Sequence, residues 1–152
     1  MAGVHIQAKL DGLEQLQRRI ERLTQPDRRR LLNAVGAEIE SQTRRRIQTE
    51  KKGPDGKPWA PLSERYATWK LRKKGSLDLL RLSGDLQDSI QHLLSGGQVE
   101  VGSNLPYAAI RQFGGAEVGR PGDLPRPYLG LSAENEKDLL QVVHDYFERL
   151  AA

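Results

Sequence analysis

Apolar residues recur along this 152-residue chain with two periods, and each period predicts a different secondary structure. Alternation over residues 4–10 predicts a half-buried strand with His5 facing water. Spacing of three to four residues predicts a helix over about residues 13–23 and a longer one over about residues 27–48. The apolar stripe of the longer helix consists of Leu31, Leu32, Val35 and Ile39.

The second half of the chain alternates short elements with two loops. Residues 50–61 are rich in Gly, Pro and Lys and predict an exposed loop, and a short helix capped near Ser63 follows it. The pair Gly96 and Gly97 before a β-type run favours a hairpin. Residues 114–125 hold four glycines and two prolines. They predict a second exposed loop, which we expect to order only against a partner.

A last helix is expected after Ser132, which suits the cap position, with acidic residues in the first turn. Its apolar stripe runs from Leu139 to Leu150, and His144 falls on the opposite, polar face. Together these elements predict one α+β domain over residues 1–152, in which a long helix and a C-terminal helix pack a small, mostly antiparallel sheet. At this length one core is expected.

Composition excludes several classes of protein. The chain has no cysteine, which rules out disulfides and thiolate chemistry. Its longest apolar run is residues 107–110, so we expect neither a membrane span nor an export signal. The histidines at 5, 92 and 144 lack metal-ligand spacing, and no phosphate-binding glycine motif or acid–base pair is evident. We therefore expect no enzyme, cofactor or metal, and a hydrolase is a distant third hypothesis.

The charge is unevenly distributed along the chain. Residues 1–75 hold 18 Lys and Arg against 9 Asp and Glu, and residues 76–152 hold 6 against 11. Such asymmetry is typical of a nucleic-acid face, and equally of subunits whose basic half docks on the acidic half of the next copy.

Basic clusters carry the DNA hypothesis. The candidates for facing DNA are Arg30, Arg44, Arg45, Lys51 and Lys52. On the long helix, Arg30 and Arg44 stand about 21 Å apart, so they do not form one compact stripe. Arg28 and Arg46 flank the apolar stripe, and we expect their stems to lie along apolar surface. We favour solvated or subunit-contacting arginines over a dedicated DNA-reading face.

Aromatic residues and a proline-flanked arginine are the candidate contact residues. Trp59 and Trp69 are either interface anchors or parts of a core poor in aromatics. Arg126 lies between Pro125 and Pro127, which hold the backbone extended, so its guanidinium serves as an internal staple for the last helix or as an intersubunit contact. The simplest interpretation of the remaining aromatics places Tyr107, Phe113 and Tyr128 in the core.

Four sequence motifs follow one another along the chain before the helical tail, over residues 53–62, 80–90, 99–115 and 125–132. This order resembles the phage virion morphogenesis or tail-completion family, small proteins that join the head connector to the tail. The likeness covers roughly residues 25–150. Family members often carry His where this chain has Arg111.

The resemblance implies a structural protein of the virion neck or tail, made in the host cytoplasm. Its expected partners are its own copies in a ring, the head-connector and tail proteins, and DNA passing through the ring. Candidate subunit or partner contacts are Trp59, Arg111, Arg126 and Tyr128. The alternative function is a non-specific DNA-binding accessory protein.

Overall fold

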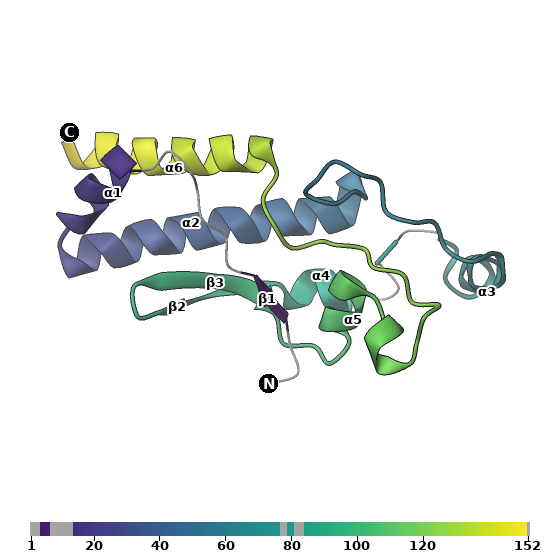
Figure 1. The fold of residues 1–152 in the computed structure, drawn as a ribbon. Helices are drawn as coiled ribbons and strands as arrows, with labels where there is room; N and C mark the ends of the chain where they lie inside the picture. Colours follow the sequence, from purple (N-terminus) through teal and green to yellow (C-terminus); the bar gives the residue numbers. More distant parts are fainter. Residues whose placement is uncertain (1–3, 7–13, 77–78, 81–83, 152) are drawn as a thin grey trace.

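A computed structural model describes residues 4–6, 14–76, 79–80 and 84–151. Its centre is the long helix α2 (Gln25–Arg45), which lies between a small sheet on one side and the C-terminal helix α6 (Ala133–Ala151) on the other (Figure 1). The expected α+β class is confirmed. The last helix packs on α2, so the molecule has three layers in the order sheet, α2, α6.

The sheet has three antiparallel strands in the order β1-β3-β2: β1 (Val4–Ile6), β2 (Gln91–Ser95) and β3 (Gln98–Ser103). The predicted hairpin is confirmed as β2 and β3. Gly96 and Gly97 have φ of 55° and 79°, the left-handed pair that a tight two-residue hairpin turn requires. Of the strand expected over 4–10, residues 4–6 are β1, and residues 7–10 lie outside the described part.

α2 approaches the hairpin most closely at Gly36. A Cβ added there would lie 2.5 Å from Cδ2 of His92 and 2.8 Å from Cγ2 of Val99. Because Gly36 has no Cβ, the side chains of His92 and Val99 can pack directly against the backbone of α2.

The predicted long helix is present, with a change of winding at its end. Thr24 caps α2 by accepting a hydrogen bond from the Asp27 amide. After α2 the chain continues as a wide turn, η1 (Arg46–Glu50), which stops at Lys51 with φ of 55°.

Two buried clusters lie along α2. One joins α1 (Glu14–Glu21) and α6 to the first half of α2, around Leu31, Val143 and Phe147. The other lies at the far end, between the end of α2, the sheet and the loops. Its buried members are Val4, Ile47, Trp59, Leu86, Ile90, Val101, Ala108, Tyr128 and Leu129.

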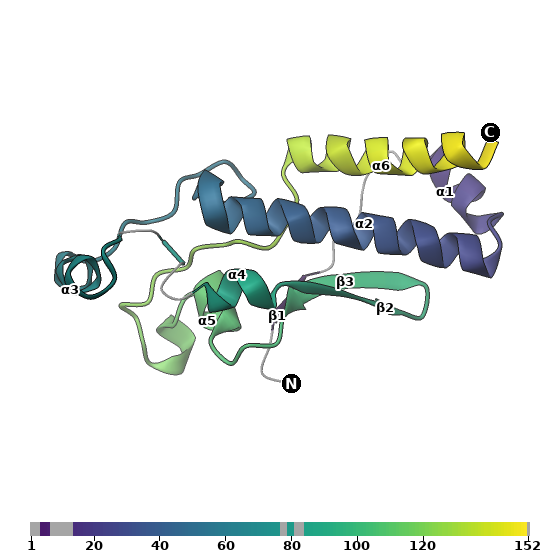
Figure 2. The same ribbon diagram turned by 180° about the vertical axis from the view of Figure 1, so that it is seen from behind.

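The short helices lie toward that second end: α3 (Glu64–Lys74), α4 (Asp85–Ser89), α5 (Ala108–Phe113) and the single turn η2 (Ala116–Val118). Ser63 caps α3 as expected, accepting from the Tyr66 amide. Figures 1 and 2 show α3 standing apart from the body, at the opposite end from the C-terminus.

Two expectations need correction. Tyr107 and Phe113 are not core residues, because 37% and 64% of their surfaces are exposed, whereas Tyr128 is fully buried. The loop over 114–125 has hydrogen bonds of its own, and whether a partner orders it further stays a prediction. Its backbone closes on itself, with the Gly115 amide donating to Asp123 O at 2.8 Å and the Arg120 amide donating to Gly115 O at 2.8 Å.

Candidate functional site

The extended segment 125–130 is held from one side by a buried arginine at the end of α2. Nη1 of Arg46 donates to Tyr128 O at 2.7 Å and to Gly130 O at 3.2 Å, and Nη2 donates to Oδ1 of Asn135. Only 1% of Arg46 is exposed. Burial lowers the pKa of its guanidinium, and the nearby Glu50 carboxylate partly offsets this. The expectation that Arg46 merely lays its stem on apolar surface is wrong, because its head is buried and bonded.

Arg126 holds the same segment from the other side. Its Nε donates to Ala60 O at 2.8 Å and its Nη2 donates to Pro61 O at 3.0 Å. Both hydrogen bonds lie within the chain, and they join the segment to the loop before α3 rather than to the last helix. Burial lowers the pKa of Arg126, and the like charge of Arg111 lowers it further.

Gln112 completes this network, and the sequence carried no signal for it. Its Oε1 accepts from the amides of Tyr128 and Leu129, both at 3.0 Å, and its Nε2 donates to Leu129 O. The hydroxyl of Tyr128 donates to Ala108 O at 2.8 Å, and burial raises the pKa of this phenol well above its usual value of 10. Trp59 Nε1 donates to Pro127 O at 2.8 Å. Trp59, Arg126 and Tyr128 thus make their contacts inside the chain.

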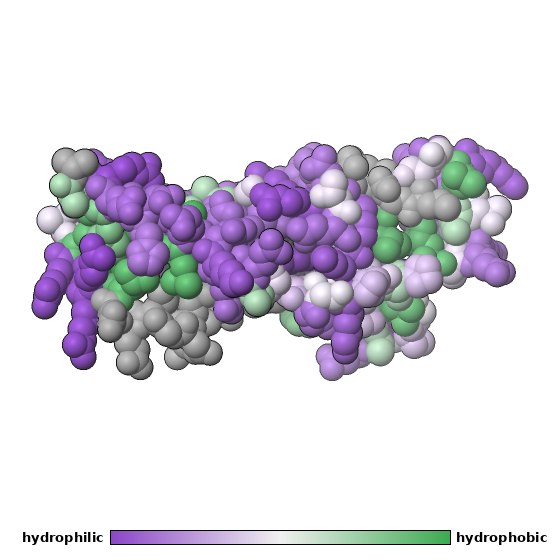
Figure 3. Space-filling model, turned by 90° about the horizontal axis from the view of Figure 1, so that it is seen from above, coloured by the Kyte–Doolittle hydropathy of each residue, from purple (hydrophilic) through white to green (hydrophobic). Residues whose placement is uncertain are grey.

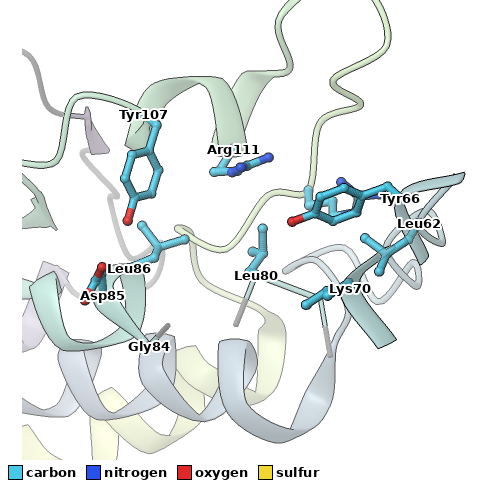
Figure 4. Close-up of a pocket in the computed structure, with 10 residues that line it drawn as sticks. Leu62, Tyr66, Lys70, Leu80, Gly84, Asp85, Leu86, Tyr107 and Arg111 are labelled. Atoms are coloured by element: carbon cyan, nitrogen blue, oxygen red, sulfur yellow. The ribbon is translucent and has the colours of Figure 1, made fainter. Parts of the chain in front are cut away.

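Arg111 and Arg126, two of the candidate contact residues, line a cavity. An open pocket of about 260 Å³ lies between α3 on one side and α4 and α5 on the other (Figure 4). Its lining residues are Leu62, Tyr66, Lys70, Leu80, Gly84, Asp85, Leu86, Tyr107, Arg111 and Arg126. In Figure 4, Tyr107 and Tyr66 stand at opposite sides, with Arg111 between them and Leu80 and Leu86 below.

Most of the large apolar side chains exposed in the described ranges come from α3 and from the α5–η2 region, and two of them, Tyr66 and Tyr107, line this pocket, whereas Leu93 and Leu150 lie on β2 and α6. The name apolar end is used below for a set of exposed residues, which are Tyr66, Trp69, Leu71, Tyr107, Phe113, Val118 and Leu124. Tyr66 and Trp69 stack on α3, with ring centroids 5.5 Å apart. Figure 3 shows green surface at both ends of the molecule, at the end where α3 lies and at the opposite end, on either side of a mostly purple middle. Exposed apolar residues gathered in this way mark an interaction surface.

The DNA-facing candidates divide into two groups. Arg44 and Lys51 form hydrogen bonds with backbone carbonyls. Nη2 of Arg44 donates to Ile90 O, and Nζ of Lys51 donates to Leu79 O. Arg45 and Lys52 are exposed, and so is Arg30, which pairs with Asp27. The five do not form one surface. Arg18, Arg22 and Arg29 are also exposed, at the α1–α2 corner where α1 leads into α2.

Residues with catalytic potential are sparse in the described ranges. They contain no group of three His, Cys, Asp or Glu side chains that could hold a metal ion. His92 contacts Glu40 through Nδ1 at 2.6 Å, and His144 is exposed on α6 as expected. Among the described helices, none is long and apolar enough to cross a membrane.

The described residues form a small three-layer α+β domain with an internal hydrogen-bond network around residues 125–130 and a group of exposed apolar side chains. The chain belongs to the Phage virion morphogenesis family, whose sequence pattern matches residues 6–148. This confirms the family that the ordered motifs indicated.

Two curated proteins are similar to the chain. One is "Mu-like prophage FluMu G protein 2" of Haemophilus influenzae, 31% identical over 150 residues, covering 95% of this chain and 98% of the relative. The other is "Putative capsid assembly protein G" of Escherichia phage Mu, 29% identical over 120 residues and 76% of each protein. No solved structure matches the chain.

Proposed function

We propose that this phage morphogenesis protein is a non-catalytic tail-completion protein, which forms a ring at the neck between the head portal complex and the tail. The apolar end is the observation that carries the proposal. Its seven exposed side chains come from α3 and the region of α5 and η2. Leaving them in water is unfavourable, and contact with other proteins would remove them from it.

The charge distribution supports a ring over an isolated subunit. A closed ring needs a head-to-tail contact between two different surfaces of the same chain. The basic excess before residue 76 and the acidic excess after it supply side chains of both signs for such a contact. Location in the virion and contact with head-connector and tail proteins follow from this role.

A phage that lacks the gene tests the proposal. Host cells infected with it should contain filled heads and separate tails in electron micrographs, and supplying the gene from a plasmid should restore joined particles. Normal particles without the gene would contradict the joining role. Empty, unfinished heads would instead indicate a role in capsid assembly, the activity that the name of the Mu relative suggests.

DNA contact is a secondary proposal, carried by the exposed arginines of the α1–α2 corner. Scattered phosphate contacts without base reading predict binding of duplex DNA in the non-specific range, with a Kd of about 10⁻⁴ to 10⁻⁶ M at physiological salt. Nanomolar binding to one sequence in a titration would favour the DNA-binding alternative over the ring.

A further inference from the structure

The pocket of the apolar end carries an unbalanced positive charge. Three cations, Lys70, Arg111 and Arg126, and one carboxylate, Asp85, line it. Arg126 is bonded to the Ala60 and Pro61 carbonyls, and Lys70 and Asp85 each have an interaction within the chain. Arg111 is therefore the cation left to receive a ligand.

The surroundings of Arg111 indicate an anion as that ligand. Within the described residues its guanidinium has one recorded contact, with the ring of Tyr107 at 5.9 Å from the centroid, and no carboxylate or carbonyl partner. The side chain is half-buried and lies near the like charge of Arg126. A partly desolvated guanidinium gains most from a carboxylate, which accepts two parallel hydrogen bonds.

The size and the lining of the pocket suit a protein side chain better than a larger organic molecule. At about 260 Å³ it is below the roughly 300–1,000 Å³ of pockets that bind drug-sized molecules. Its walls combine two tyrosine rings with the aliphatic side chains of Leu62, Leu80 and Leu86. An apolar side chain next to a carboxylate matches this lining.

The loop after α5 presents that combination on the same chain. Glu117 and Val118 lie on η2 at the tip of the loop, and 64% of the Val118 surface is exposed. In the described structure Glu117 has no recorded cation partner. The base of the loop is fixed by the Arg120–Asp123 ion pair at 2.8 Å and by its backbone hydrogen bonds, so the tip is pre-formed. Holding the tip in place before binding reduces the entropy cost of contact.

We propose that the η2 tip of one copy, with Glu117 and Val118, inserts into the Tyr66–Tyr107 pocket of the next copy and places Glu117 on Arg111. The tip contributes no residue to its own pocket, so the contact joins two different parts of the chain, and a head-to-tail arrangement of copies is the one that builds the proposed ring. This inference rests on the proposed ring and names its interface.

A charge exchange between the two surfaces tests the contact. Glu117→Arg and Arg111→Glu should each weaken association at least about tenfold in sedimentation velocity, because each change opposes like charges in the interface. The double variant should recover association, because every contact in it again pairs Arg with Glu. An equimolar mixture of the two single variants should also recover association, because contacts between unlike variants pair Arg with Glu. Glu148→Arg, the same charge change on the exposed face of α6, is the matched control and should behave as wild type.

The possible outcomes distinguish failure of the proposed Glu117–Arg111 contact from failure of the proposed ring. Each variant is first shown to melt as wild type does. If wild type assembles and the single variants assemble equally well, the ring stands and this contact is wrong. Single variants that lose association but do not recover in the mixture also overturn the contact. Wild-type protein that remains a monomer at every concentration would count against the ring itself.

Discussion

Replacing Arg46 with Met should cost about 3 kcal/mol of folding free energy. Methionine keeps much of the buried stem but removes the donors to Tyr128 O and Gly130 O. Each buried acceptor left unpaired costs about 1–3 kcal/mol, so the two carbonyls together would cost about 2–6 kcal/mol. Asn135 loses less, because its Oδ1 also accepts from the Ser132 amide. The substitution also removes the desolvation penalty of a buried charge, which offsets part of the lost folding free energy. The lowered pKa of Arg46 reflects that penalty.

Thermal melting followed by circular dichroism measures the effect. For a chain of this length, a loss of about 3 kcal/mol lowers Tm by about 6–12 °C. Arg45→Met is the matched control, because Arg45 is exposed and surface changes usually stay within about 0.5 kcal/mol. If Arg46→Met melts within 2 °C of wild type (about 0.5–1 kcal/mol), the buried network around residues 125–130 does not hold this end of the fold together.

Three further predictions concern single positions. Arg126→Ala should lower stability by about 1–3 kcal/mol in chemical denaturation, because the Ala60 and Pro61 carbonyls lose their donors; unchanged stability with failed particle joining would instead assign Arg126 to an intersubunit contact. Gly36→Ala should cost about 1–2 kcal/mol despite alanine's higher helix propensity, since its Cβ meets His92, whereas Gly122→Ala has open space and should be neutral. Because burial raises the pKa of Tyr128, its phenol loses its proton at a lower pH in the unfolded chain than in the folded one. The stability that this phenol contributes below pH 10 should therefore fall by about 1.4 kcal/mol for each pH unit above pH 10. Tyr128→Phe should lack that component when Tm is measured at pH 9 and 11.

The sequence could predict the elements whose signals are local. Ser63 caps α3 and Ser132 accepts from the Asn135 amide at the start of α6, and both caps depend on residues within three positions. The Gly96–Gly97 turn is equally local. These features follow from backbone geometry and need no knowledge of tertiary contacts.

The internal network could not be predicted, because its partners are far apart in the chain. Arg46 reaches acceptors 82 to 89 residues away, and an arginine at the edge of an apolar stripe usually keeps its head in water. Gln112 gives no sequence signal, since glutamine is common on surfaces. Hydrophobicity alone places Phe113 in the core, although aromatic residues also mark interfaces.

A cryo-electron microscopy reconstruction of the virion neck tests the central claim most directly. The account predicts a ring of copies of this chain at the junction of head and tail, with α3 and η2 of each copy against its neighbour. A neck in which no density fits the three-layer domain would contradict the proposed function. A ring in which the apolar end faces solvent would contradict the basis on which that function was inferred.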